Sequence, residues 1–154
     1  MKNIIQEAIL FMENQYKLEP VKFNGSNPCK DYLRLQLAEE KEEVFAAMFL
    51  TNQFQLLGFE KLFRGSITEA SIYPRPIIRK IFEYNAAKIV IAHNHPSGEC
   101  KPSNNDNLIT ERLYKLFKEI DCTLVDHIIV SPVETFSYAE KNFFNFYIGV
   151  NHHA

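Results

Sequence analysis

Apolar residues recur along this chain at two spacings: the three-to-four-residue period of amphipathic helices, and the short continuous runs of buried strands. Helical spacing predicts four helices, over residues 2–15, 28–37, 77–85 and 103–119. Apolar runs predict strands over residues 44–51, 54–63, 88–93 and 123–130, followed by a short element at 135–137 and a last helical turn near 138–141. Asn27 and Ser103 are expected to cap the second and fourth helices, with Pro28 in the first position of the second.

The order of these elements predicts a mixed sheet covered by helices. Residues 44–51 and 54–63 bracket Asn52-Gln53, which is typical of a hairpin. The β-branched run at 88–93 has a helix on each side in sequence, as expected of a central strand buried on both faces. The fold class is therefore α/β or α+β. We expect residues 1–26 to form an N-terminal helix and connector, and residues 27–154 to form a single domain.

Composition narrows the class of protein. The chain has 154 residues, 46% of them hydrophobic, which is enough for one globular core. Its apolar runs are far shorter than the roughly 20 residues that span a bilayer. Gln6, Glu7 and Glu13 interrupt any signal-peptide core near the N-terminus. We therefore expect a cytoplasmic protein without a membrane span.

Charge and cysteine content argue against DNA binding and against a disulfide framework. A net charge of −2 provides no concentrated basic face, so composition does not support DNA binding. The three cysteines, Cys29, Cys100 and Cys122, are odd in number and lack C-x-x-C spacing, so we expect reduced thiols and no disulfide framework. The sequence sets no oligomeric state.

Candidate chemistry is concentrated where the 88–93 strand ends. His93 and His95 are two residues apart in extended chain, so their imidazoles can point to the same side. Pro96 and Gly98 then turn the chain, and Asp106 follows in the first turn of the next helix. Two histidines and a carboxylate, with a fourth position left to water, make the ligand set of a catalytic zinc site.

Each part of this pattern also has a purely structural interpretation. Ser103 and Asp106, three residues apart at a helix start, form the pattern of an N-terminal capping box. A His-x-His pair at a strand end is often satisfied by ordinary hydrogen bonds. Capping and catalysis are compatible, because the same helix start can position both side chains.

The run HNHPSG followed by PSNND resembles the JAMM (JAB1/MPN/Mov34) metalloprotease signature, and more closely the bacterial RadC family, also called UPF0758. Other sequence motifs of that family occur in the same order along the chain, namely EEVFAAMFLTNQ, LFRGSITEASIYPR and LVDHIIVS. The resemblance covers roughly residues 28–141. It implies a cytidine-deaminase-like JAB/MPN fold, with a curved mixed sheet flanked by helices.

The resemblance also implies roles for individual residues. One Zn²⁺ per chain would be held by His93, His95 and Asp106, with Ser103 donating a hydrogen bond to the developing oxyanion. Glu43, in EEVFAAMF, matches the family glutamate that acts as general base. Its neighbour Glu42 is the alternative, although it should face the other side of the strand. Both glutamates also fit a solvated charge cluster.

Several positions depart from the family pattern or lie beside it. Pro76 stands where the family usually has a glutamate, so any role of that side chain is absent. Longer members carry a further N-terminal region with helix-hairpin-helix character, so its DNA contacts are not inherited here. His127 is either a structural histidine or a residue supporting the metal or substrate site. Cys100 is interpreted as a loop residue, and His152 and His153 as part of a tail.

These observations favour a zinc metallopeptidase or isopeptidase that acts on a peptide or protein substrate. The alternative is an accessory protein of DNA repair or of a mobile element, with a zinc site and no peptidase activity. Nucleobase deamination would need His-x-Glu and Pro-Cys-x-x-Cys, and the sequence contains neither.

Overall fold

A computed structural model describes residues 3–18, 23 and 25–144 of the chain. Its elements follow in the order α1 (Ile4–Leu18), α2 (Ser26–Leu37), β1 (Val44–Leu50), β2 (Leu56–Arg64), the 3-10 helix η1 (Glu69–Ser71), α3 (Pro74–Tyr84), β3 (Lys88–Asn94), α4 (Asn104–Lys118), β4 (Thr123–Val130) and β5 (Thr135–Ser137). Within these residues, no helix is both long enough and apolar enough to cross a membrane.

The five strands form one mixed sheet in the order β2-β1-β3-β4-β5. Strand β1 pairs antiparallel with both β2 and β3, and β5 pairs antiparallel with β4. Only β3 and β4 are parallel, and α4 makes the crossover between them. The predicted α/β class, a mixed sheet flanked by helices, is confirmed.

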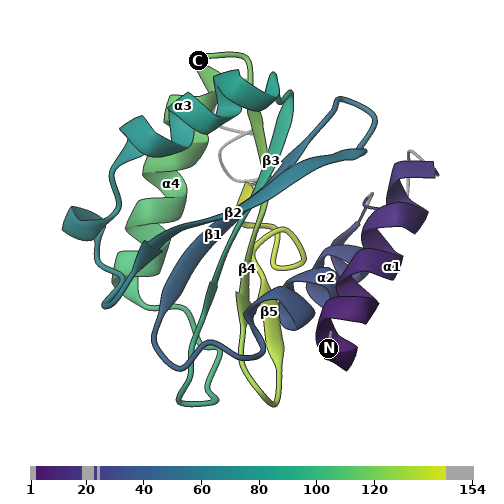
Figure 1. Ribbon diagram of the computed structural model, residues 1–154. Helices are drawn as coiled ribbons and strands as arrows, with labels where there is room; N and C mark the ends of the chain where they lie inside the picture. The colour runs from purple at the N-terminus through teal and green to yellow at the C-terminus, as the bar shows by residue number, and fades with distance from the viewer. Residues whose placement is uncertain (1–2, 19–22, 24, 145–154) are drawn as a thin grey trace.

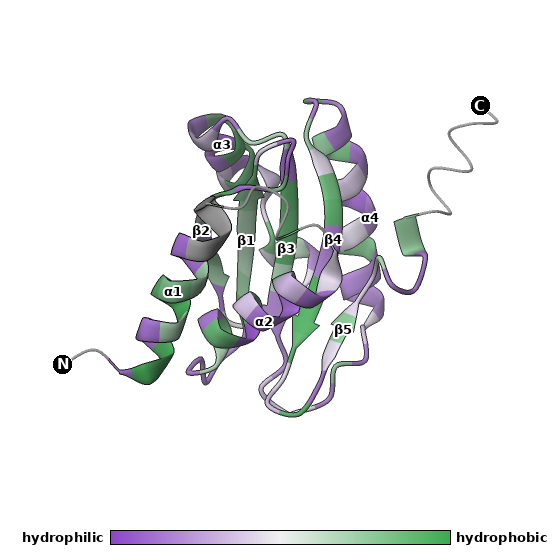
Figure 2. Ribbon diagram, turned by 90° about the vertical axis from the view of Figure 1, so that its right-hand side faces the viewer, coloured by the Kyte–Doolittle hydropathy of each residue, from purple (hydrophilic) through white to green (hydrophobic). Residues whose placement is uncertain are grey.

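The helices cover both faces of the sheet (Figure 1): α1 and α2 lie on one face, and α3 and α4 on the other. Strand β1 is buried throughout, and its alternate side chains contribute to two cores. Phe45 and Phe49 belong to the core beneath α3 and α4, whereas Met48 and Leu50 belong to the core beneath α2. The central strands are accordingly rich in hydrophobic residues (Figure 2).

Most predicted elements are found within a few residues of their expected bounds. The hairpin of β1 and β2 is present, and Ser103 caps α4 as predicted. Pro74 and Pro76 lie in the first turn of α3, where proline is tolerated. All three cysteines are free thiols, as expected, and all three are buried.

The predicted start of the second helix is wrong. Helix α2 begins at Ser26 with Gly25 as its N-cap, so Asn27 lies inside the helix and Pro28 is its third residue. Gly25 has a φ of 117°, a backbone conformation that glycine adopts without steric cost. The Ser26 hydroxyl is hydrogen-bonded to the carboxylate of Glu140, which fixes the helix start against the far end of the chain. At that end, hydrogen-bonded turns over residues 138–142 replace the expected helical turn.

Asp126 is a buried carboxyl group on the α2 side of β4. It accepts hydrogen bonds from the backbone N–H groups of His127 (2.8 Å) and Ala139 (3.0 Å), and from the Ser137 hydroxyl (2.6 Å). Despite these bonds, burial raises its pKa from 3.8 to about 6. Between about pH 4 and pH 6, Asp126 is therefore mostly protonated in the folded protein and mostly ionised in the unfolded chain.

This proton makes folding stability depend on pH. A raised acid pKa in the folded state means that the contribution of Asp126 falls as pH rises from about 4 to about 6, and is constant above that window. In Asp126→Asn this pH dependence disappears, because the amide stays neutral while keeping one oxygen as acceptor.

We expect the free energy of unfolding of Asp126→Asn, measured relative to wild type, to be higher at pH 7 than at pH 4. The difference should be at most about 3 kcal/mol, because the pKa of Asp126 rises from 3.8 to about 6. Urea unfolding at both pH values measures the difference, and Glu119→Gln at an exposed carboxylate is the control. An unchanged difference between Asp126→Asn and wild type would refute the raised pKa.

Candidate metal centre

His93, His95 and Asp106 come from the end of one strand and the start of the next helix. His93 is the sixth residue of β3 and is fully buried. His95 follows the strand, and its backbone N–H donates to the Val130 carbonyl at 2.8 Å, which continues the pairing with β4. Asp106 lies in the first turn of α4, where it and Ser103 form a reciprocal capping box. The predicted spacing thus brings all three side chains to one edge of the sheet.

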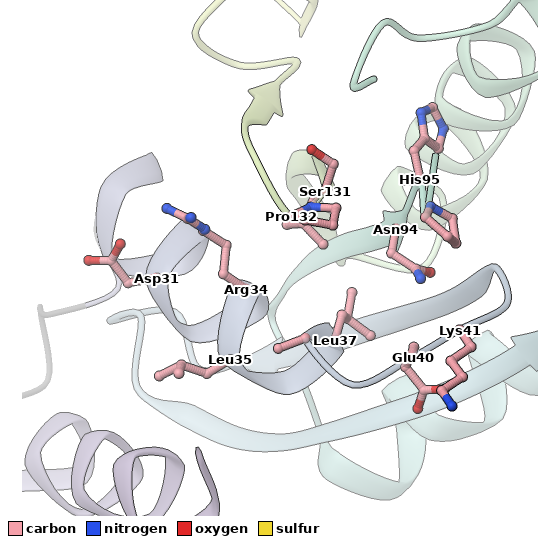
Figure 3. Close-up of a pocket in the computed structure, with 13 residues that line it drawn as sticks. Asp31, Arg34, Leu35, Leu37, Glu40, Lys41, Asn94, His95, Ser131 and Pro132 are labelled. Carbon is pink, nitrogen blue, oxygen red and sulfur yellow. The ribbon is translucent and has the colours of Figure 1, made fainter. Parts of the chain in front are cut away.

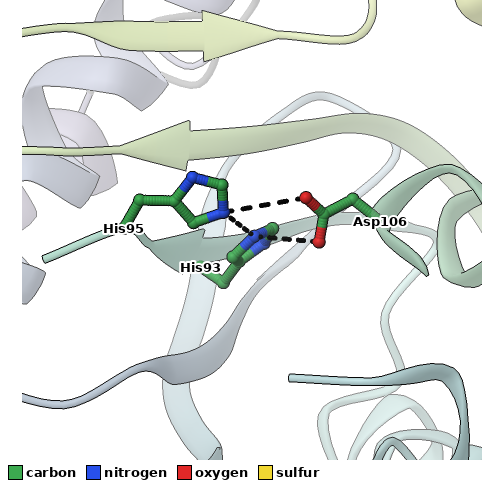
Figure 4. Close-up of side chains that lie close together, drawn as sticks. All are labelled: His93, His95 and Asp106. Carbon is green, nitrogen blue, oxygen red and sulfur yellow. Dashed lines mark hydrogen bonds and ion pairs between the residues drawn. The ribbon is translucent and has the colours of Figure 1, made fainter. Parts of the chain in front are cut away.

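Figure 4 shows these three side chains pointing at one another. The Nε2 atoms of His93 and His95 are 2.9 Å apart. The carboxylate of Asp106 reaches both, with Oδ1 3.2 Å from His93 Nε2 and Oδ2 3.6 Å from His95 Nε2. The three groups offer one ligand atom each, all within 4.8 Å of one another, so they could hold a single metal ion.

A chain of hydrogen bonds behind the site fixes the tautomer of His93. The Thr110 hydroxyl donates its one hydrogen to the Asp106 carbonyl at 2.6 Å, so it must accept from His127 Nδ1, 2.5 Å away. Neutral His127 then accepts at Nε2 from His93 Nδ1–H, at 2.9 Å. His93 Nε2 is left as a lone pair that points into the site.

The tautomer of His95 is fixed by a single hydrogen bond to the backbone. Its Nδ1 lies 2.7 Å from the backbone carbonyl of Glu99, which can only accept. The hydrogen is therefore on Nδ1, and Nε2 is again a lone pair. Two nitrogen lone pairs and a carboxylate consequently face one another without a donor hydrogen, an arrangement that requires a positive charge among them. The donor set fits a divalent metal, and imidazole with carboxylate suits zinc.

The electrostatics of the site agree with this requirement. Burial acts to raise the pKa of Asp106, but the adjacent His93 and His95 side chains and a hydrogen bond from the Ser103 backbone N–H hold it well below its usual range. The Asp106 carboxylate in turn raises the pKa of His95. His127 differs, because complete burial and the neighbouring His93 lower its pKa well below the ordinary value. His127 thus stays neutral and serves the hydrogen-bond chain.

Glu43 lies beside this cluster, immediately before β1. Phe45 pairs with His93 in the sheet, so Glu43, two residues earlier, lies opposite His95 on the same face. Its carboxylate is close enough to help raise the pKa of His95, and Oε2 accepts a hydrogen bond from the Ile67 backbone N–H at 3.1 Å. Glu42 is exposed instead, with its carboxylate 3.9 Å from Arg64. Of the two glutamates, the structure places Glu43 beside His93, His95 and Asp106.

Ser103 has a structural task that leaves its proton available. Its Oγ accepts from the Asp106 backbone N–H at 3.0 Å, while its own backbone N–H donates to Asp106 Oδ2 at 2.7 Å. In the described part of the chain the hydroxyl accepts this one hydrogen bond and donates none, and the residue is exposed. The side chain is therefore able to donate a hydrogen bond to a ligand at the site.

Asn94 is a positioning residue that the sequence patterns did not identify. Its side chain lies on the opposite face of β3 from His93, where Oδ1 accepts from the Val44 backbone N–H at 2.7 Å and Nδ2 donates to the Glu42 carbonyl at 3.0 Å. These two bonds clamp the chain on both sides of Glu43. The one sequence signal was the position of Asn94, a polar residue between His93 and His95 at the end of a strand predicted to be buried.

Thr110 was missed for a similar reason, since a threonine inside a helix gives no sign of its partner on β4. His127, for which a structural and a supporting role were both open, lies between Thr110 and His93. It also stacks on Tyr138 at a centroid distance of 4.8 Å. Cys100 is not one of the candidate ligands, and its thiol donates to the Glu134 carbonyl at 3.2 Å. His152 and His153 lie outside the described residues.

Comparison with known proteins places this geometry in a family. A family model described as a RadC-like JAB domain matches residues 23–143. Among curated relatives, a UPF0758 protein of Methylibium petroleiphilum is 43% identical over 119 residues, which cover 77% of this chain and 54% of the relative. One of Idiomarina loihiensis is 46% identical over 119 residues, covering 77% of this chain and 53% of the relative.

A shorter relative matches over most of both chains. The UPF0758 protein YkfG of Escherichia coli K12 is 34% identical over 139 residues, which cover 90% of this chain and 88% of that protein. The chain thus spans about half the length of the first two relatives and most of the length of YkfG.

The hydrogen-bond chain predicts an effect of Thr110 on metal affinity. Thr110→Val keeps the shape of the side chain but removes the hydroxyl that fixes His127, and through it the His93 tautomer. Loss of such a supporting partner typically weakens metal binding about 10–100-fold. Competition between the protein and a chromophoric zinc chelator measures this, with the exposed Thr123→Val as control. Equal zinc affinity of a folded Thr110→Val variant and wild type would contradict the role assigned to Thr110.

The clamp around Glu43 predicts an effect on stability. Asn94→Ala leaves the buried N–H of Val44 and the Glu42 carbonyl without their side-chain partners, at a cost of about 1–3 kcal/mol for the unsatisfied group. We expect a corresponding fall in the free energy of unfolding in urea. The exposed Asn105→Ala in α4 should change it by less than about 0.5 kcal/mol. Similar losses of unfolding free energy in the two variants would show that the Asn94 side chain does not stabilise the chain beside Glu43.

Proposed function

The chain belongs to the family of RadC-like JAB domains, and from that premise we propose that it is a zinc-dependent hydrolase of peptide or isopeptide bonds. Its substrate would be a peptide or a protein. The domain would act as the catalytic unit, with one zinc ion per chain.

The observation that carries the proposal is the cluster of three acceptor groups with a carboxylate beside it. Two imidazoles and one carboxylate are the protein ligands of many catalytic zinc sites, which keep a further position open. Glu43 stands on the same face as that cluster and is not paired with a cation in the described part of the chain. A carboxylate in this position is suited to proton transfer.

The residues divide the chemistry of amide hydrolysis among them. His93, His95 and Asp106 would hold zinc, which when bound supplies the Lewis acidity that lowers the pKa of a water and polarises a carbonyl. Glu43 would accept the proton of the attacking water and deliver it to the leaving amine. Ser103 would donate its hydroxyl hydrogen to the oxygen that becomes negative in the transition state. Thr110 and His127 hold the His93 ring in the orientation and tautomer that the site needs.

The proposal predicts separable effects of the two neighbouring glutamates. Glu43→Gln removes the proton acceptor while leaving the three ligands in place, so hydrolysis should fall by at least about a hundredfold with zinc content still near one ion per chain. Glu42→Gln, at the exposed neighbour, should retain wild-type activity. A peptide-library cleavage assay, with and without chelator, and metal analysis of protein purified without a histidine tag measure both quantities.

The same measurements identify the competing outcomes. An active Glu43→Gln variant beside an inactive Glu42→Gln variant would exchange the two roles. Absence of zinc from both the purified and the reconstituted wild-type protein would overturn the metalloenzyme. Stoichiometric zinc without cleavage of any peptide would favour the accessory role in DNA repair or in a mobile element.

A further inference from the structure

A cleft of about 800 Å³ opens between α2 and the carboxyl ends of β3 and β4 (Figure 3). One wall is formed by the second half of α2 and the loop that follows it, including Arg34, Leu37 and Lys41. The other wall is formed by residues 94–96 and 130–132. Its volume lies within the range of about 300–1,000 Å³ that is usual for ligand pockets.

The cleft borders the candidate metal centre at one shared residue, His95. Its lining includes His95, whose Nε2 is one of the three ligand atoms, and Asn94, which clamps the chain beside Glu43. A molecule seated in the cleft therefore contacts His95, one of the three candidate metal ligands, from the α2 side of the sheet. This position suits the part of a substrate that extends to one side of the reacting bond.

The inner surface of the cleft is mainly aliphatic. Leu35, Leu37, Val130 and Pro132 contribute apolar surface, and no Phe, Tyr or Trp lines the cleft. A surface of this kind accommodates an aliphatic side chain. Beyond the imidazole of His95 it offers no series of rings on which successive nucleic-acid bases could stack, which favours a peptide over a single-stranded oligonucleotide as occupant.

Charge along the cleft favours an acidic ligand. Of the lining carboxylates, Glu40 already binds Lys61 Nζ at 2.8 Å and Arg64 Nη1 at 2.7 Å, so its charge is neutralised. Arg34 and Lys41 have no hydrogen-bond or ion-pair partner among the described residues, and Asp31 is the one remaining carboxylate in the lining. The cations thus exceed the free anions here, although the whole chain carries a net charge of −2.

We propose that this cleft binds an acidic peptide segment on one side of the scissile bond, with an aliphatic side chain against Leu35 and Leu37 and a carboxylate at Arg34. The inference rests on the proposed hydrolase function, because it assigns the cleft to that enzyme's substrate. A guanidinium with free donors binds a carboxylate through two parallel hydrogen bonds, which makes Arg34 the selective group. The cleft thus gives the enzyme a preference for sequences in which leucine-like and acidic residues adjoin.

A binding experiment tests the cleft without requiring cleavage. The probes are the fluorescein-labelled pentapeptide Gly-Leu-Glu-Leu-Gly and the same peptide with glutamine in place of glutamate, each carrying a C-terminal amide. Anisotropy titrations use the full zinc-loaded chain in the Glu43→Gln background, so that the probe stays intact. We expect the glutamate peptide to bind about tenfold more tightly than the glutamine peptide, as one charge-assisted hydrogen-bonded pair provides.

Matched variants locate the binding. Arg34→Glu should weaken binding of the glutamate peptide at least about tenfold and change binding of the glutamine peptide little. Ala38→Trp, at an exposed lining position, fills the cleft and should weaken both peptides. Arg79→Glu, an exposed position on α3 across the sheet, changes the net charge equally and should leave both affinities within about twofold. Urea unfolding checks that each variant is folded.

The proposal is overturned if the glutamate peptide does not bind, if it binds no better than the glutamine peptide, or if Arg34→Glu and Ala38→Trp behave like Arg79→Glu. Displacement of the probe by a thymidine dodecamer would also overturn it, in favour of a nucleic-acid ligand. Failure of the hydrolase function gives a different result, in which the variants alter probe binding but the chain with Glu43 intact cleaves no peptide. Cleavage that is insensitive to Arg34→Glu and Ala38→Trp would support the hydrolase function and refute the proposal that the cleft binds the substrate.

Discussion

Two imidazole nitrogens and a carboxylate face one another at the carboxyl end of β3, and each of the three can only accept a proton or a metal. The hydrogen-bond partners of His93 and His95 lie on the far sides of their rings, at His127 and at the Glu99 carbonyl. Those partners leave the lone pairs directed inward, so the three groups need a proton or a metal ion between them. Neighbouring residues maintain this arrangement: Thr110 fixes the tautomers of His127 and His93, and the Ser103 backbone N–H donates to the Asp106 carboxylate.

The topology of the sheet brings these groups together. β3 is antiparallel to β1 and parallel to β4, and the crossover through α4 starts at the carboxyl end of β3. The carboxyl end of β3, the first turn of α4 and the beginning of β1 therefore meet at one edge of the sheet. In α/β sheets such an edge is a usual place for a ligand site. Here it collects metal-ligand candidates from β3 and α4 and a carboxylate from the start of β1.

The two faces of the sheet have different tasks at this edge. On the α4 face, His93, Asp106 and Glu43 gather around the candidate metal position. On the α2 face, Asn94 clamps the chain beside Glu43, and the aliphatic cleft opens below it. One residue of β3 thus links the position of the proposed base to the wall of the proposed substrate cleft, because adjacent residues of a strand point to opposite faces.

The sequence by itself determined the elements with strong local signals: the hairpin, the buried central strand, the capping box at α4, and the spacing that brings His93, His95 and Asp106 together. These follow from neighbours within a few residues, where hydrophobic period and capping chemistry act. The start of α2 was placed wrongly because its N-cap is Gly25, which has no side chain to signal a cap, and because Ser26 is bonded to a carboxylate distant in sequence, Glu140. Only the tertiary structure decided which of two adjacent glutamates reaches the site, what Thr110, His127 and Asn94 do, and where a cleft opens. Each of these depends on pairing between residues 17 to 52 positions apart or on the packing of separate elements, which local sequence patterns do not encode.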